Sequence, residues 1–208
     1  MNLKLKKLSK MFLRVRKHRG KRNVVSYQNS GFWKCKFKFK GFSNRIISED
    51  SLFYKCVFLF AGSNNLIKID KNSKFKNVTF CIEGDNNVIT IGKNASFCGK
   101  TEIVCLEGTK VTIGNNILSS SDVYIKTSDS HSIYDFDHKR VNIAKDVIIG
   151  NNVWLCQKAS ILKGSIIPNN CVVAYGSIVT KQFHDSNCIF GGNPAKIIKK
   201  NIEWGEER

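Results

Sequence analysis

Large aliphatic side chains recur at every sixth residue through the last third of the chain. Small or β-branched side chains follow each of them four positions later, from Val147 to Ser177. A helix repeats at about 3.6 residues and a strand at about 2, so a period of six fits neither as one long element. It predicts short strands separated by corners, with the large side chain pointing inward. The expected inward set is Ile143, Ile149, Leu155, Ile161, Ile167, Val173 and Val179.

A longer repeat organises the earlier part of the chain. Its units begin at Gly41, Gly62, Gly84 and Gly108, which are 21, 22 and 24 residues apart. Each unit has the length of three six-residue faces plus a few loop residues. The six-step recurs inside the units, where Phe replaces Ile at several expected inward positions: Ile69, Phe75 and Cys81, then Ile91, Phe97 and Ile103. The pattern therefore predicts an all-β solenoid of stacked coils paired in parallel, with wider early coils.

Three segments fall outside the repeat. Residues 1–22 are basic and carry apolar side chains at helical spacing (Leu5, Leu8, Phe12, Val15), which predicts a helical arm. Residues 128–142 interrupt the six-step with a polar loop. Residues 191–208 follow the last coil, and their isoleucines suggest a short C-terminal helix. The expected organisation is an arm over 1–22, a solenoid domain over 23–190 and a tail over 191–208.

Composition narrows the class of protein. Lys and Arg number 34 against 16 Asp and Glu, giving a net charge of +18, and 42% of residues are apolar, including 14 Phe. The chain is thus expected to be globular, with an anionic partner. It has neither an apolar run long enough to span a bilayer nor an apolar secretion core, so a cytoplasmic location is expected. The eight Cys include no C-x-x-C pair and are expected to be reduced, mostly as small core residues.

Two motifs after the hexapeptide run point to a known family. The run is followed by Val179-Thr180-Lys181 and then by Gly192-Asn193-Pro194-Ala195-Lys196. Together they resemble the hexapeptide-repeat acyltransferases, over about residues 41–200. That resemblance implies a left-handed parallel β-helix, a homotrimer with active sites between subunits, and acetyl-CoA as cosubstrate. The loop sequence Asp129-Ser-His131-Ser-Ile-Tyr-Asp135, with Arg140 and Asn142, resembles O-acetyltransferases of bacterial capsule and lipopolysaccharide sugars, including sialic acid.

The catalytic candidates lie in the loop and the next coil. Acetyl transfer to a hydroxyl requires a base that works near neutral pH, and histidine is the natural choice. His131 matches the family's catalytic histidine, whereas His138 is expected to be a solvated loop residue. Asp135 or Asp129 could orient the imidazole. Trp154 should point outward, as a wall of the cleft or as a trimer contact.

The remaining site candidates come from the resemblance. It implies Gln157, Tyr175, Thr180, Lys181 and Lys196 on the donor side, with a backbone amide near Gln157 as oxyanion donor. Lys199 and Lys200 add positive charge nearby. Tyr175 and Cys156 stand where the family usually has small residues, which leaves the shape of the donor channel open. The acceptor candidates are Tyr134, Arg140 and Asn142.

Other functions remain as alternatives at this stage. The fold also accommodates acetyl transfer to an amino group of a nucleotide sugar or small metabolite. A metal hydratase resembling γ-class carbonic anhydrase needs three histidines around its metal, and the relevant stretch offers only two, so no metal is expected. A purely structural solenoid is a third alternative. No nucleic-acid motif accompanies the basic charge, so an anionic glycan is the expected partner. The basic arm could cap the solenoid, pack in the trimer or touch the inner membrane face.

Overall fold

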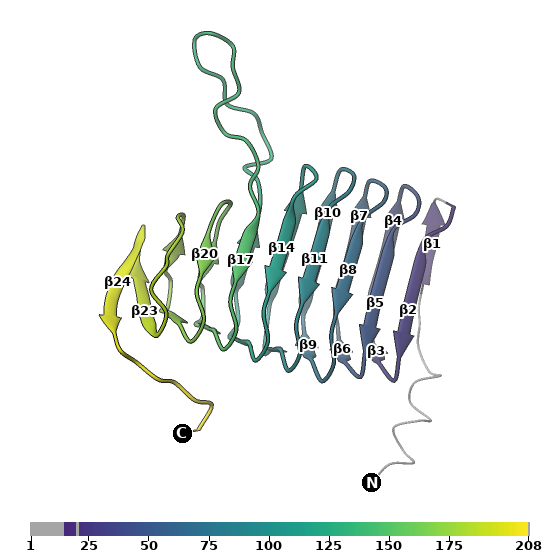
Figure 1. The fold of residues 1–208 in the computed structure, drawn as a ribbon. Helices are drawn as coiled ribbons and strands as arrows, with labels where there is room; N and C mark the ends of the chain where they lie inside the picture. Colours follow the sequence, from purple (N-terminus) through teal and green to yellow (C-terminus); the bar gives the residue numbers. More distant parts are fainter. Residues whose placement is uncertain (1–14, 20, 208) are drawn as a thin grey trace.

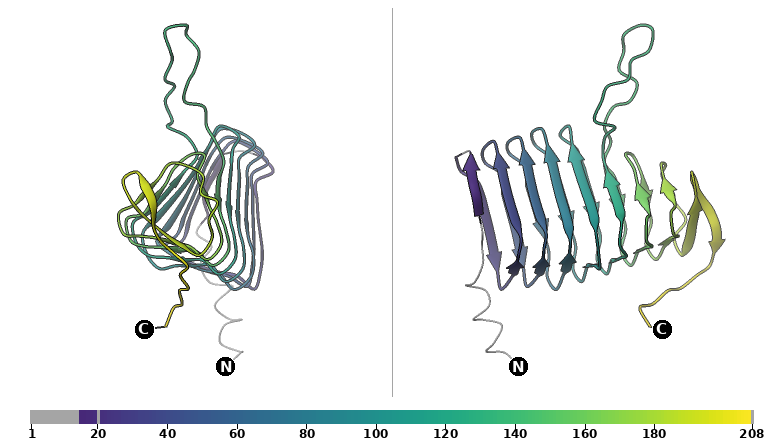
Figure 2. Two further views of the ribbon diagram at one scale, coloured as in Figure 1. Left: turned by 60° about the vertical axis from the view of Figure 1, so that its left-hand side comes forward. Right: turned by 180° about the vertical axis from the view of Figure 1, so that it is seen from behind.

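The computed structural model describes residues 15–19 and 21–207, and these form a three-sided parallel β-solenoid (Figure 1). Each coil contributes one short strand to each of three sheets, and neighbouring strands run parallel everywhere except in a C-terminal hairpin. The left view in Figure 2 shows the coils stacked on one another, and buried side chains fill the space that they enclose. The predicted all-β solenoid is confirmed. The described residues contain no helix, and therefore none able to cross a bilayer.

The strands are numbered in chain order. The first sheet contains β1 (Val15–Arg19), β4 (Lys36–Lys40), β7 (Val57–Ala61), β10 (Val78–Glu83), β13 (Thr101–Leu106), β16 (Val123–Lys126), β19 (Ser160–Ile161) and β22 (Ile178–Val179). The second sheet contains β2 (Val24–Gln28), β5 (Arg45–Glu49), β8 (Leu66–Ile69), β11 (Val88–Ile91), β14 (Lys110–Ile113), β17 (Val147–Ile149) and β20 (Ile166–Ile167). The third sheet contains β3 (Gly31–Trp33), β6 (Leu52–Tyr54), β9 (Lys74–Lys76), β12 (Ser96–Phe97), β15 (Leu118–Ser119), β18 (Trp154–Leu155), β21 (Val172–Val173), β23 (Cys188–Gly192) and β24 (Ala195–Lys200).

The three corners of each coil stack into three edges of the solenoid. The first edge joins the first sheet to the second, the second edge joins the second sheet to the third, and the third edge joins the third sheet to the first of the next coil. An edge lies opposite the sheet that it does not border. The first edge and the third sheet are therefore on opposite sides of the molecule.

Coil length divides the solenoid into two halves. In the wide coils, up to residue 126, stacked residues of adjacent coils mostly have a separation of 21 or 22 in the sequence, as in Asn44 with Asn65 and Asn65 with Asn87. In the narrow coils, from residue 146 onward, this separation is 18, as in Asn151 with Asn169 and Asn152 with Asn170. The predicted difference in width between early and late coils is confirmed.

Stacked phenylalanines fill the wide coils. Phe37, Phe58 and Phe80 form one column, with ring centroids 4.8 and 4.9 Å apart and nearly parallel planes. Buried Ile, Leu and Val take over in the narrow coils. Because parallel stacking repeats every side chain directly above its counterpart, one residue type per position fills the interior without voids.

The glycines that begin the early units are required by close approach between coils. A Cβ on Gly41 would lie 2.1 Å from the carbonyl oxygen of Gly62, and one on Gly62 would lie 1.9 Å from that of Gly84. Three residues after each glycine, a buried asparagine joins a ladder formed by Asn44, Asn65 and Asn87. Each asparagine side-chain oxygen accepts from the backbone and amide nitrogens of the next asparagine, at 2.8 to 3.2 Å. The ladder satisfies polar backbone groups that the wide corner would otherwise leave buried and unpaired.

Several expectations about individual elements are wrong. The C-terminal helix is absent, because β23 and β24 form an antiparallel hairpin on which Ile198 is 62% exposed. Ile143 is 60% exposed, since the loop still continues there and the regular step begins at Val147. Cys81 points outward between the buried side chains of Phe80 and Ile82.

The helical arm is not shown. Val15–Arg19 is strand β1, and residues 1–14 lie outside the described residues. The cysteine expectation holds in large part. All eight thiols are free, and five of them are buried: Cys35, Cys56, Cys105, Cys171 and Cys188.

Candidate active site

A long loop leaves the solenoid at the first edge, between β16 and β17. It projects well beyond the corners of the other coils (Figures 1 and 2). Its outer part is a narrow hairpin. Tyr134 and Arg140 form an antiparallel β-bridge there, and the Val141 amide donates to the Ile133 carbonyl at 2.9 Å. The sequence predicted this interruption at 128–142. The structure extends it to about residue 145, where the backbone nitrogen of Lys145 donates to the Thr127 carbonyl.

His131 lies near the base of this loop, on its exposed surface. The buried side chain of Asn142 fixes the backbone around it. Its Nδ2 donates to the His131 carbonyl at 2.8 Å and to Asp129 Oδ2 at 2.9 Å, while its Oδ1 accepts from the Ile133 amide at 2.7 Å. Asn142 was predicted to bind the acceptor. That role stays a prediction, and in the structure the Asn142 side chain bonds the backbone on both sides of His131.

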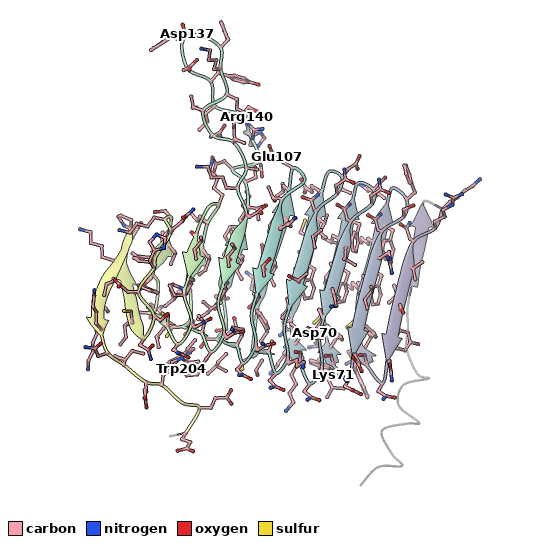
Figure 3. The ribbon with its side chains drawn as sticks, viewed as in Figure 1. Asp70, Lys71, Glu107, Asp137, Arg140 and Trp204 are labelled. Atoms are coloured by element: carbon pink, nitrogen blue, oxygen red, sulfur yellow. The ribbon has the colours of Figure 1, made fainter. Side chains whose placement is uncertain are left out.

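An ion pair anchors the loop to the neighbouring coil. Arg140 donates to both carboxylate oxygens of Glu107, at 2.5 and 3.0 Å, and Ser128 Oγ also donates to Glu107. These donors lower the pKa of Glu107 to about 2. Figure 3 shows Glu107 and Arg140 together below the loop tip, which Asp137 marks. Glu107 was missed in the sequence analysis, because it lies in the turn after an ordinary strand, β13, and no motif marks it.

The two carboxylates proposed to orient His131 are both bonded elsewhere. Asp135 Oδ1 accepts from the backbone nitrogens of Asp137 and Lys139, at 3.0 and 2.8 Å, and so shapes the loop tip. Asp129 accepts from Asn142 and from Lys163 Nζ at 2.5 Å, and this ammonium group lowers its pKa. Asp129 therefore ties the residues beside His131 to the first edge of the following coil. No motif in the sequence predicts this contact of Lys163.

Trp154 lies on β18 of the third sheet, outside the core as expected. Its Nε1 is 3.4 Å from Ser120 Oγ, and its ring centroid is 6.0 Å from that of Trp204. Trp204 Nε1 in turn donates to the Asn152 carbonyl at 2.9 Å, which holds the C-terminal segment across this sheet. Figure 3 places Trp204 on the side of the solenoid opposite Glu107 and Arg140. Within one chain, therefore, Trp154 and the loop that carries His131 do not meet.

The predicted donor-side residues divide between the same two regions. Gln157 and Tyr175 occupy the third edge, where Lys158 Nζ lies 5.5 Å from the centroid of the exposed Tyr175 ring. Thr180 and Lys181 are exposed at the first edge, on the same edge as the loop base. Lys196 is exposed on β24. Thr180 and Lys181 therefore lie on the same edge as the loop of His131, whereas Gln157 and Tyr175 lie on an edge that borders the sheet of Trp154.

The remaining histidines lie apart from this arrangement. His138 is at the loop tip with a positive φ of 57°, and its amide donates to the Asp135 carbonyl. His184 is exposed after the last coil. Across residues 15–19 and 21–207, no group of three or more His, Cys, Asp or Glu side chains is placed to hold a metal ion.

Comparisons with known proteins show which proteins the chain resembles. No family model matches it. A polysialic acid O-acetyltransferase of Escherichia coli O1:K1 is 45% identical over 84 residues, which cover 40% of this chain and 27% of that protein. The match thus spans only about a quarter of that relative's length.

Two solved structures are similar over most of their length. The polySia-specific acetyltransferase NeuO has a TM-score of 0.67 and 32% identity, over 93% of this chain and 82% of that one. The polysialic acid O-acetyltransferase OatWY has a TM-score of 0.72 and 26% identity, over 91% and 92%. This chain therefore belongs to the hexapeptide-repeat acetyltransferases, and within them it resembles the enzymes that modify polysialic acid capsules.

Proposed function

We propose that this protein transfers an acetyl group from acetyl-CoA to a hydroxyl of a bacterial surface glycan, with His131 as general base. The observation that carries the proposal is the anchored loop. Asn142, Asp129 and the Glu107–Arg140 pair hold the His131 backbone at the first edge, while its imidazole remains open to a substrate. The similarity to polysialic acid O-acetyltransferases supports a carbohydrate hydroxyl as acceptor and a sialic acid polymer as the first substrate to test.

The reaction requires one proton relay and no acetyl-enzyme. The His131 imidazole takes the proton from the acceptor hydroxyl as that oxygen attacks the thioester carbonyl carbon. A carbon–oxygen bond forms, the carbon–sulfur bond breaks, and the imidazolium returns the proton to the departing sulfur of CoA. A backbone amide near Gln157 is the proposed donor to the oxyanion.

The site is proposed to form between two subunits of a homotrimer. The first edge supplies His131, Thr180 and Lys181, and the third sheet and third edge supply Trp154, Gln157 and Tyr175. Because these groups lie on different sides of one chain, a threefold arrangement of left-handed coils would set one chain's first edge against the third sheet of its neighbour. The exposed ammonium groups of Lys181 and Lys196 suit the phosphates of CoA.

We place this activity in the cytoplasm, where acetyl-CoA is available. The inner membrane face, where surface glycans are assembled, is one proposed contact of the basic residues 1–22, and packing in the trimer or on the end of the solenoid is the other.

The test is an assay of purified protein with acetyl-CoA and polysialic acid, following CoA release and the ester product. His131→Ala should lower kcat by about 10²–10⁴-fold while acetyl-CoA still binds. His138→Ala, in the same loop, should leave kcat within about twofold of the unsubstituted protein. Retention of kcat within about tenfold in His131→Ala would remove this residue as the general base.

The donor assignment has a separate test. Lys181→Ala should raise the KM for acetyl-CoA more than it lowers kcat, because a phosphate contact binds ground state and transition state alike. An unchanged KM would remove Lys181 from the donor site.

A further inference from the structure

A column of lysines follows the third edge through the first four wide coils. The track, as we name it, consists of Lys34, Lys36, Lys55, Lys76 and Lys100, all with exposed side chains. Backbone hydrogen bonds stack the coils here, as from the Lys55 nitrogen to the Trp33 carbonyl and from the Lys36 nitrogen to the Cys56 carbonyl. Successive coils are about 4.8 Å apart, so the ammonium groups form a closely spaced row.

The charge of the track is not balanced locally. Residues 31–38, 52–59 and 74–81, which build its first three coils, contain no Asp or Glu, whereas the matching segment of the fourth coil, residues 96–103, contains Glu102. The second edge of the same coils differs, because Lys71 pairs with Glu49 at 3.1 Å and Lys68 lies 3.6 Å from Asp70. In its first three coils the track therefore lacks the neighbouring carboxylates that the lysines of the second edge have.

Backbone conformation at this edge indicates that lysine is not there for local stability. Lys34 and Lys55 have positive φ values of 54° and 55°, a conformation that long side chains adopt reluctantly and asparagine tolerates. Most corners of the second edge use asparagine for this purpose, at Asn72, Asn94, Asn116, Asn152 and Asn170, and so does the corner of the third edge that stacks on Lys55, at Asn77. Residues that break a local preference are candidates for a functional role.

Exposed aromatic rings lie beside the lysines. Trp33 is 43% exposed and Tyr54 is 36% exposed, on adjacent strands of the third sheet. Lys55 Nζ lies 5.3 Å from the centroid of the Tyr54 ring. Flat apolar rings beside cations suit sugar rings that carry carboxylates. A row of lysines does not suit the core of a protein interface, where lysine is depleted.

The track leads toward the proposed active site. The same edge continues through Gln157, Lys158 and Tyr175 in the narrow coils. Asp122 intervenes, and Gln157 Nε2 lies 3.4 Å from its carboxylate. A chain laid along the third edge of the wide coils would therefore point one end at the cleft.

We propose that the track binds an extended anionic polysaccharide and guides it to the active site. This inference rests on the proposed function, because it assigns the acceptor of that reaction. It predicts that a polymer is a better substrate than a short oligomer, since only a polymer spans several coils.

The test compares two variants of equal charge change in the full chain. The track variant is Lys34→Asn, Lys55→Asn and Lys76→Gln, in which asparagine keeps the positive φ. The control variant is Lys68→Gln, Lys93→Asn and Lys110→Gln, on the second sheet and second edge. Binding of long-chain polysialic acid is measured by fluorescence anisotropy at low salt in a His131→Ala background, and the ratio of kcat/KM for the polymer to that for disialic acid is measured with His131 intact.

The track variant should bind the polymer about tenfold more weakly, and its kcat/KM ratio should fall by a similar factor. The control variant should change either quantity by less than about twofold. Equal weakening in both variants, or none in the track variant, would overturn the proposal. So would track-dependent binding to phosphatidylglycerol vesicles without track-dependent binding to the polymer, which would assign the lysines to a membrane. Track-dependent polymer binding by a protein that acetylates no glycan would support the track and refute the proposed function.

Discussion

The wide and narrow halves of the solenoid reach the same architecture by different chemistry. The narrow coils have the shorter repeat and fill their interior with Ile, Val and Leu. The wide coils add three or four residues per turn, fill the larger interior with stacked Phe, and line one corner with a buried asparagine ladder. The loop that carries His131 leaves the first edge where the two halves meet.

The two halves therefore depend on different interactions. A narrow coil needs only correct apolar packing, because its short corners bury few polar groups. A wide coil also needs polar side chains that replace missing backbone partners at its longer corners. The halves should therefore respond differently to substitution.

The largest effect is expected from a charge in the narrow core. Ile161 is fully buried between Ile125 and Val179. Ile161→Asp would bury an unpaired carboxylate and should lower the free energy of unfolding by about 3–5 kcal/mol. Ile161→Val, the matched control, should cost about 0.5–1.5 kcal/mol. Urea denaturation measures both, and an aspartate variant as stable as the valine variant would show that the narrow interior is not dry.

A smaller effect should distinguish the halves directly. The Asn65 side chain bonds Asn44, Asn87 and the Gly84 carbonyl. Asn65→Ala leaves several buried groups unpaired and should cost about 2–3 kcal/mol. Ser165→Ala, at a narrow corner where the hydroxyl donates only to the Val179 carbonyl, should cost about 1 kcal/mol. Equal losses in denaturation experiments would mean that the ladder is not a special requirement of wide coils.

The smallest stability effect is expected at the anchor of the loop. Glu107→Gln weakens the pair with Arg140, but both side chains are about 30% exposed, so the free energy of unfolding should fall by less than about 1 kcal/mol. Turnover should fall more noticeably, because His131 is positioned through this loop. Glu49→Gln, which breaks the pair with Lys71 in the wide half, should not alter turnover. Equal turnover in the two variants would separate the anchor from catalysis.

The same pair gives a pH dependence of known sign. The folded-state pKa of Glu107, about 2, lies below its ordinary value of 4.5. The stability that the ionised Glu107 carboxylate gives to the folded state is therefore complete above pH 4.5 and is lost as the pH falls toward 2. Limited proteolysis of the loop should accelerate over this acid range in the native protein, and the acceleration should be absent in Glu107→Gln.

Much of the fold could be predicted because its repeat is visible in side-chain type. The six-step placed Ile149 to Val179 inward, and the glycine spacing identified the wide coils. The C-terminal helix was wrong because Ile197 and Ile198 fit a helical stripe and a strand equally well, and the pairing of β24 with β23 decided between them. The prediction that Cys81 points inward was wrong because the extra residues of a wide coil shift the six-residue register within a unit.

The site was predictable in part for a similar reason. His131 and Trp154 stand in recognisable motifs, but their partners come from elsewhere in the chain. Glu107 bonds Arg140 from an earlier coil, and Trp204 reaches Trp154 from the C-terminal segment. The spacing of residues in a single sequence does not predict contacts between such distant segments. The buried asparagine ladder depends on stacking between coils, which the sequence of a single corner does not reveal.

The central claim is that His131 of one chain works with the Trp154 region of another. It is tested by mixing His131→Ala with Trp154→Ala subunits, after partial denaturation and refolding together, and measuring acetyl transfer. If each variant alone is inactive, random threefold mixing at equal amounts should restore about a quarter of the sites, and so about a quarter of the original turnover. A mixture no more active than its components would contradict a site shared between chains.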